Sequence, residues 1–269
     1  MKAPSVVHIA SRDNAFLKAL RKLTHDPAAY RKQGRIWLEG DHLCRAALVR
    51  GVQPQAAVFS RSLWEQGIAQ EWHAGLDRVH VLEDALFAQL SGLESAARMG
   101  YVLSAAAMLQ RHGNMDAAAK TVVLDRIQDA GNVGSILRSA SALGFKQVLA
   151  LQGTAAMWSP KVLRAGMGAH FGLHLFEGCS LHDVEGLQVP LLVTHLQGSG
   201  LLHRVTLPTP CAWVFGHEGQ GVDSTLVQRA AQLLRIDQPG GEESLNVAAA
   251  AAICLHASAT SPSCRASRV

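Results

Sequence analysis

Apolar residues recur along the chain in two alternating patterns: short runs rich in Val, Ile and Leu, and longer stretches with the spacing of one helix face. In the second half, the nearly continuous apolar runs are TVVLD, QVLAL, LLVTHL, AWVFG and LLRID. Such runs are typical of parallel strands covered on both faces. Helical patterns lie between them, at residues 133–143, 160–165, 224–231 and 245–257. The alternation predicts an α/β fold with a parallel sheet covered by helices.

The first half alternates in the same way with shorter elements. We predict helices at residues 14–23 and 42–49, and strands at 36–38, 56–59, 79–82 and 101–105. These would form a small α/β/α sandwich. The polar segment LQRHGNMDAAAK follows neither period, so it is predicted to be a linker. The expected organisation is a domain at 1–108, a linker at 109–120, a second domain at 121–258 and a disordered tail at 259–269.

Length and composition exclude several classes of protein. The 269 residues, 48% of them apolar, are enough for two packed domains. No apolar run approaches the roughly 20 residues that a membrane span needs, and the first residues do not resemble a signal peptide. The five cysteines form no C-x-x-C pair, and the thirteen histidines lack the spacing of metal ligands. We expect a cytoplasmic protein with reduced thiols, no metal and no membrane partner.

The net charge of +4 is unevenly distributed. Residues 1–112 hold 14 Lys and Arg against 10 Asp and Glu, whereas residues 113–269 hold 11 of each. The first fifty residues carry much of the positive charge, including Arg21, Lys22, Arg31, Lys32 and Arg35. A solvated helix surface would explain this excess as well as a nucleic-acid interface would, so charge alone does not decide between them.

One unusual loop follows the first strand of the second half. In parallel α/β sheets, ligands bind beyond the carboxyl ends of the strands. Asn132 and Gly134 lie in the strand-to-helix turn QDAGNVGSILRSA, and Arg138 follows further along the helix. Glycines allow close backbone approach, and a helix start offers free N–H groups to an anion. A tight turn with an exposed arginine is the structural alternative, and no G-x-G-x-x-G supports a dinucleotide site.

Two further loops carry polar residues directly after strands. VFGHEGQGV places Glu218 among glycines, where a flexible solvated loop is the alternative to a ligand contact and His217 is expected to be incidental. RIDQPGGEESLNV leads into an Ala-rich helix, for which Ser244 is the predicted N-cap. A capped helix accounts for Ser244 but less well for Asn246.

Together these loops resemble the three motifs of the SpoU/TrmH family of RNA ribose methyltransferases, in the SPOUT superfamily. Their spacing and order match N-x-G-x-x-x-R-x-A, then G-x-E-x-x-G, then I-P-x-x-G followed by S-L-N-V. The matching residues are Asn132, Gly134, Arg138 and Ala140; Gly216, Glu218 and Gly221; and Ile236, Gly240, Ser244, Leu245, Asn246 and Val247. The departures are Asp237 for the usual Pro, His217 for a frequent Asn, and Gly166 for a frequent Ser in SPKVLRAGMGAHF.

The resemblance extends over nearly the whole chain and implies a fold and partners. The second domain would be a parallel sheet with a deep trefoil knot, which pairs with a second copy as a homodimer. Residues 1–108, around Glu39 and Gly40, resemble an L7Ae-like substrate-binding domain. Its basic residues, Arg21, Lys22, Arg31, Lys32 and Arg35, would hold structured RNA through phosphates.

The implied activity is transfer of a methyl group from S-adenosylmethionine to a ribose 2′-hydroxyl, in ribosomal RNA rather than transfer RNA. The implied catalytic residues are Arg138, Asn132, Glu218, Ser244 and Asn246. The implied cofactor contacts are Thr194, Leu196, Gly198, Phe215, Gly216, Ile236, Gln238, Leu245 and Asn246. The alternatives are a transfer RNA methyltransferase, an inactive RNA-binding or ribosome-assembly protein, and a nucleotide-binding enzyme of another α/β type.

Overall fold

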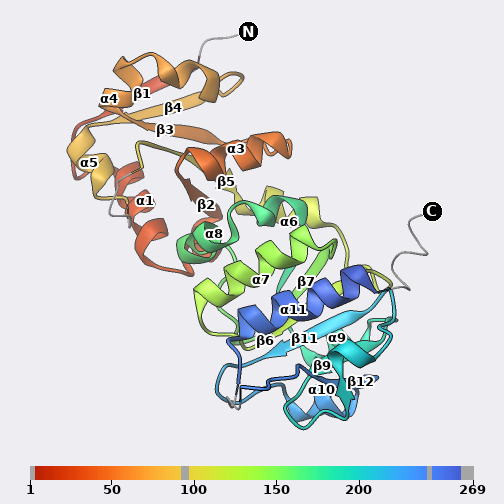
Figure 1. The fold of residues 1–269 in the computed structure, drawn as a ribbon. Coiled ribbons are helices and arrows are strands. Elements are labelled where there is room, and N and C mark those ends of the chain that lie inside the picture. The colour runs from red at the N-terminus through yellow and green to blue at the C-terminus, as the bar shows by residue number, and fades with distance from the viewer. Residues whose placement is uncertain (1–3, 92–96, 241–243, 262–269) are drawn as a thin grey trace. The chain divides into compact units, whose positions relative to one another are not determined.

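The computed structural model describes residues 4–91, 97–240 and 244–261, which form two compact units (Figure 1). The first unit comprises the described residues up to Arg111 together with Trp158–Phe171, and the second comprises His112–Met157 and the described residues from Gly172 onward. The predicted tail at 259–269 starts too early, because residues 259 and 260 belong to the last helix, Val247–Thr260. Residues 262–269, which include Cys264, lie outside the described residues. The other four cysteines are buried free thiols.

A five-stranded mixed sheet is the centre of the first unit (Figure 1). Its strands run in the order β1 (Ser5–Ile9), β4 (Arg78–Leu82), β3 (Ala56–Ser60), β5 (Met99–Ser104) and β2 (Arg35–Glu39). The first three are parallel, and β5 is antiparallel to both of its neighbours. β1 is absent from the predicted strands because this edge strand buries only Ile9, so its sequence pattern carries no core signal.

Short helices pack against this sheet. They are α1 (Ala15–His25), α2 (Ala29–Gln33), α3 (Asp41–Val49), α4 (Arg61–Glu65), α5 (Asp84–Ala88) and α6 (Ala105–His112), with a 3₁₀ turn η1 (Ile68–Trp72). In α1, Asn14 caps the first turn, and the three buried leucines lie three residues apart on one face. The predicted linker begins inside α6: residues 109–112 continue that helix, in whose first turn the Ala107 backbone N–H donates to Ser104 Oγ.

The segment around α8 (Pro160–Gly166) belongs to the first unit although it follows the first strands of the second. It contacts β2, and Gly168 lies directly against Ala46 of α3. A Cβ on Gly168 would lie 2.4 Å from the Ala46 Cβ, and the backbone there has φ +84°. Glycine is therefore required at this position by both the packing and the backbone conformation.

The second unit is built on seven parallel strands, which confirms the predicted parallel sheet (Figure 1). Their order is β10 (Gly200–Leu201), β12 (Gln232–Arg235), β9 (Leu191–Thr194), β11 (Ala212–Gly216), β6 (Thr121–Asp125), β7 (Gln147–Leu151) and β8 (His174–Cys179). The central strands β6, β7 and β11 are almost wholly buried. The two edge strands are absent from the predicted strands, because β10 has only two residues and β8 is partly exposed and interrupted by Gly178.

The helices of the second unit are α7 (Ala130–Ala142), α9 (Leu181–Glu185), α10 (Ser224–Gln228) and α11 (Val247–Thr260). The α11 helix packs along α7 and contacts β11 (Figure 1). Its buried end is fixed by a hydrogen bond of 2.7 Å, donated by Trp213 Nε1 of β11 to Ser258 Oγ. Among the described residues, no helix is long and apolar enough to cross a membrane.

We expect Ser258→Ala to destabilise the second unit. Both Trp213 and Ser258 are buried, so the substitution leaves the indole N–H without its acceptor. The cost should be about 1–3 kcal/mol in the free energy of unfolding. Urea unfolding followed by circular dichroism would measure it, with exposed Ser135→Ala as the control. Equal unfolding free energies for Ser258→Ala and the wild type would contradict the assignment.

Candidate active site

The turn between β6 and α7 is organised by the start of the helix. Asp129 is the N-cap of α7, and its carboxylate accepts a hydrogen bond of 2.8 Å from the backbone N–H of Asn132. The helix begins at Ala130, three residues before the predicted start, because the Gly-Asn segment forms its first turn. Asn132 thus lies within the first turn of α7, beyond the carboxyl end of β6.

Glu218, in the loop after β11, binds this same turn. Its carboxylate accepts hydrogen bonds from the backbone N–H groups of Gln128 (3.3 Å) and Asp129 (3.2 Å) and from Asn132 Nδ2 (3.0 Å). Burial raises the pKa of Glu218, but these bonds together outweigh it and lower the pKa below its ordinary value. The ionised carboxylate therefore ties the loop after β11 to the start of α7.

Asn246 connects the third loop to the other two. It is the N-cap of α11, with Oδ1 accepting from the backbone N–H groups of Ala248 (2.9 Å) and Ala249 (3.2 Å). Its Nδ2 donates to Asn132 Oδ1 at 3.0 Å. The prediction of Ser244 as N-cap is wrong: the helix starts later, and exposed Ser244 forms no hydrogen bond with a described residue.

These three side chains form one chain of hydrogen bonds, which we term the polar relay: Glu218, Asn132 and Asn246. The Asn132 amide donates to the Glu218 carboxylate and accepts from the Asn246 amide. Since Asn246 Oδ1 is held by the helix start, its amide group can only donate toward Asn132. The relay fixes the orientation of all three groups and joins three segments that are far apart in sequence.

His217 shapes the loop that carries Glu218. Its Nδ1 accepts hydrogen bonds from the backbone N–H groups of Gly219 (2.9 Å) and Gln220 (3.2 Å), and its carbonyl accepts from Gly221 (2.8 Å). A Cβ on Gly216 would lie 2.4 Å from backbone atoms of Gly221, so the loop folds back on a glycine. His217 is therefore a structural residue: it supplies an acceptor, as an asparagine could.

An ion pair that the sequence did not reveal, between buried Asp125 and half-buried Arg126, holds this loop. Asp125, at the end of β6 and 1% exposed, accepts from Arg126 Nε (2.7 Å) and Nη2 (3.0 Å). It also accepts from the backbone N–H of Asp223 at 2.7 Å, while Arg126 Nη1 donates to Gln220. Arg126 has φ +58°, an uncommon conformation for a residue other than glycine. The only sequence signal was a charged residue ending an apolar strand, which does not identify its partner.

Arg138 is not part of the polar relay. It lies on α7 six residues after Asn132, and this spacing turns a side chain about 240° round the helix. The residue is exposed, and it forms no hydrogen bond or ion pair with any described residue. Its guanidinium therefore keeps all five donors for a group outside the chain.

The loops after β9, β11 and β12 hold the residues expected to contact a cofactor. These strands are neighbours and parallel, so their carboxyl ends lie together. Gly198 is closely packed: a Cβ there would lie 2.9 Å from Leu233 O. Gln238 Oε1 is buried and has no hydrogen-bond partner among the described residues. Such an orphaned acceptor fits a site that is completed by a polar ligand.

The remaining cofactor candidates divide by exposure. Thr194 ends β9, and Ile236 follows β12; both are half-buried. Leu196 and Leu245 are 56% and 39% exposed, which is unusual for leucine and leaves apolar surface available. Phe215 is fully buried in β11, so only its backbone can reach a ligand. Among the described residues, no His, Cys, Asp and Glu group could hold a metal ion.

The predicted RNA-binding residues lie on contiguous elements of the first unit. They are Arg21 and Lys22 on α1, Arg31 and Lys32 on α2, and Arg35 at the start of β2. These three elements contact one another. Arg21 donates hydrogen bonds to Gln89 and to the carbonyl of Arg12, whereas Lys22, Lys32 and Arg35 are exposed. The basic residues thus share one region of the unit.

Known proteins share this architecture. The model of the SpoU rRNA Methylase family matches residues 119–256. An uncharacterized tRNA/rRNA methyltransferase of Synechocystis is 30% identical, covering 93% of each chain. The 23S rRNA (guanosine(2553)-2′-O)-methyltransferase RlmP of Bacillus subtilis is 29% identical, covering 92% of this chain and 97% of its own. The AdoMet-bound rRNA methyltransferase from Sinorhizobium meliloti superposes with TM-score 0.79 at 25% identity, covering 94% and 97%.

Asn246→Ala should lower the free energy of unfolding by about 1 kcal/mol, because the start of α11 loses its cap. Asn246→Asp keeps the cap but places an acceptor against Asn132 Oδ1, so it should preserve most of the stability while shifting the NMR signals of the Asn132 side-chain amide. Unfolding curves of the two variants would measure the contribution of the helix cap to stability. Their ¹⁵N spectra would report on the hydrogen bond between Asn246 and Asn132. Unchanged Asn132 signals in the Asp variant would contradict the relay.

The lowered pKa of Glu218 predicts an acid-dependent stability. Its hydrogen bonds contribute fully above the ordinary carboxyl pKa of 4.5, and the contribution is lost as the pH falls through the lower pKa of the folded state. Glu218→Gln should therefore flatten the acid limb of the stability curve, with a modest effect because the residue is exposed. Urea midpoints between about pH 3 and 7 would test this, and an identical pH dependence in both proteins would refute it.

Proposed function

Since this chain belongs to the SpoU rRNA methylase family, we propose that it transfers a methyl group from S-adenosylmethionine to a ribose 2′-hydroxyl of ribosomal RNA. The observation that carries the proposal is the polar relay, which holds one residue from each of the three motif segments in a single hydrogen-bonded chain. Ribosomal RNA is favoured over transfer RNA because the relative from Bacillus subtilis is named for 23S rRNA.

The residues of the three loops fit the cofactor. Gly198 and Gly216 let the loops that carry these candidates fold tightly against neighbouring backbone, and the unpaired Gln238 Oε1 offers an acceptor. Leu196 and Leu245 provide exposed apolar surface for the adenine ring. When bound, S-adenosylmethionine supplies a sulfonium methyl group that is already activated, so the main task of the protein is alignment.

We assign Arg138 to the 2′-oxygen of the RNA. A guanidinium with a pKa above about 12 is a poor base, but its planar set of donors stabilises an oxygen that gains negative charge. Its five donors are unused by the described residues. Asn132 and Glu218 act as positioning residues: they fix the start of the helix that carries Arg138, without touching it. Ser244 is exposed beside Asn246 and is assigned to the RNA.

The family resemblance also implies a knot, a homodimer and an RNA-binding first domain. We propose that the second unit contains a trefoil knot formed around the loops after β9, β11 and β12, and that it pairs as a homodimer. The first unit would be an L7Ae-like domain that binds structured RNA through Lys22, Lys32 and Arg35, with its neighbours Arg21 and Arg31. Phosphate contacts of this kind give salt-dependent affinity. The expected location is the cytoplasm.

The test is transfer of labelled methyl from S-adenosylmethionine to ribosomal RNA and ribosomal particles from cells lacking this protein, followed by mapping of ribose methylation. One labelled 2′-O-methyl site is expected. Arg138→Ala should reduce the rate by about 100-fold or more and leave cofactor binding unchanged, since Arg138 forms no hydrogen bond or ion pair with any described residue. The matched control is Arg204→Ala, another exposed arginine of the second unit.

Two outcomes would overturn these assignments. Failure to methylate RNA or particles, despite measurable binding of S-adenosylmethionine by calorimetry, would move the function to RNA binding or ribosome assembly. Full activity of the Arg138→Ala variant would show that Arg138 has no role in the reaction. The assignment of methyltransferase activity to the protein would still stand.

A further inference from the structure

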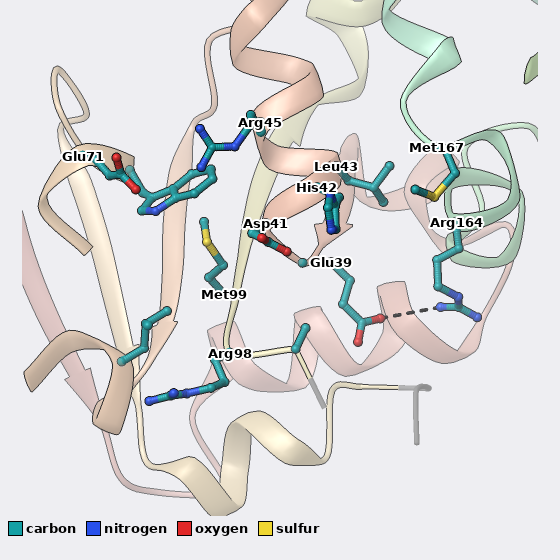
Figure 2. Close-up of a pocket in the computed structure, with 14 residues that line it drawn as sticks. Glu39, Asp41, His42, Leu43, Arg45, Glu71, Arg98, Met99, Arg164 and Met167 are labelled. Carbon is teal, nitrogen blue, oxygen red and sulfur yellow. Dashed lines mark ion pairs between the residues drawn. The ribbon is translucent and has the colours of Figure 1, made fainter. Parts of the chain in front are cut away.

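A pocket of about 720 Å³ opens in the first unit (Figure 2). Its lining comes from the end of β2, the start of α3, the start of β5 and the segment around α8. The volume lies within the range of small-molecule sites, roughly 300–1,000 Å³. None of the three motifs contributes a residue to it.

A buried carboxylate and an arginine lie side by side in this pocket. The side chain of Glu39 is only 4% exposed, and its Oε2 lies 3.5 Å from Arg164 Nη1. Figure 2 shows this ion pair as a dashed line. Its Oε1 accepts a hydrogen bond from Ser91. A carboxylate has about four acceptor positions, so Glu39 keeps free acceptor capacity. Arg164 is 32% exposed and likewise keeps free donors.

Part of the pocket wall around this pair is apolar. Leu43, Met99 and Met167 line the pocket, and Met167 is 49% exposed although it is a large hydrophobic residue. Flat aromatic rings pack well against such flexible thioether and aliphatic surfaces. The two acidic residues Asp41 and Glu71 also line the pocket and disfavour a phosphate in its interior.

We propose that this pocket binds one unpaired guanine base of the RNA substrate. The N1–H and 2-amino groups of guanine are adjacent donors that match the Glu39 carboxylate. The O6 and N7 atoms are adjacent acceptors that match the Arg164 guanidinium, which is the common arginine contact to guanine. Paired donors beside paired acceptors occur only on guanine among the four bases of RNA.

The other bases fit less well. Adenine presents its 6-amino donor where Arg164 also donates, and a ring acceptor toward Glu39. Buried polar groups left unpaired in this way oppose binding strongly. Proteins that recognise RNA sequence generally read unstacked bases in loops, which a pocket of this kind can accept. Arg98, exposed on the lining, is suited to the adjoining phosphate.

The inference rests on the proposed function for its ligand, because it takes RNA as the source of the guanine. It does not require that this base belongs to the methylated nucleotide. The pocket would instead add a sequence-specific contact to the phosphate contacts of the basic residues.

The test measures binding of fluorescein-labelled pentaribonucleotides AAGAA and AAAAA to the full chain by fluorescence anisotropy. We expect AAGAA to bind about tenfold more tightly, and the preference to disappear in Glu39→Gln and in Arg164→Met. Glu65→Gln, an exposed glutamate of the same unit outside the pocket, should retain the preference. An inosine in place of guanosine, which lacks the 2-amino group, should give intermediate affinity.

Equal affinity for the two pentamers, or an undiminished preference in both pocket variants, would overturn the inference. Tighter binding of GMP than of AAGAA would overturn RNA as the source and indicate a free guanine nucleotide. The outcome is independent of the proposed activity. Methyl transfer without a guanine preference would refute only the guanine-binding role of the pocket. A guanine preference without methyl transfer would refute only the methyltransferase activity.

A second measurement does not depend on the folding of variants. An AA(6-thioguanosine)AA pentamer irradiated with the wild-type chain should crosslink to peptides that contain Met99, Arg164 or Met167, as judged by mass spectrometry. Crosslinks confined to peptides outside the pocket would exclude it as the guanine site.

Discussion

The amide of Asn132 is the group on which the candidate site depends. It donates to Glu218 and accepts from Asn246, so two hydrogen bonds of 3.0 Å each connect the loop after β11, the start of α7 and the start of α11. Since each partner is also fixed by backbone groups, none of the three side chains can reorient alone. A hydrogen-bonded network of this kind pre-organises a site before any ligand arrives.

The residues that hold the loops of the candidate site in place are different from the residue that has free hydrogen-bond donors. The ion pair of Asp125 and Arg126 supports the loop after β11. His217 holds the same loop folded back on Gly216. Arg138 takes no part in these contacts and faces outward from the helix that they fix. The hydrogen bonds of these loops thus hold helix starts and turns, while the exposed Arg138 guanidinium donates to none of the described residues.

The first unit contains chemistry that the motif-based hypothesis did not include. The segment around α8 packs against α3 through Gly168 and brings Arg164 to Glu39. An exposed ion pair contributes little to the stability of a protein. The carboxylate of Glu39, however, is nearly fully buried and bordered by apolar side chains. A buried acid and an accessible arginine next to an open cavity give the unit a means of recognising one base, besides its basic surface.

The sequence by itself determined the strands in the centre of each sheet and the approximate positions of the longer helices, since buried runs and turn residues are local signals. The resemblance of three loops to family motifs singled out the residues of the relay. The short helices α2, α4, α5, α6 and α9 had no predicted bounds. The sequence pattern missed the edge strands β1 and β10, placed the cap at Ser244 instead of Asn246, and gave no sign that Arg126 pairs with Asp125 or that Arg164 reaches Glu39. Only the tertiary structure decided these, because partner choice depends on how segments far apart in sequence meet, which no local pattern encodes.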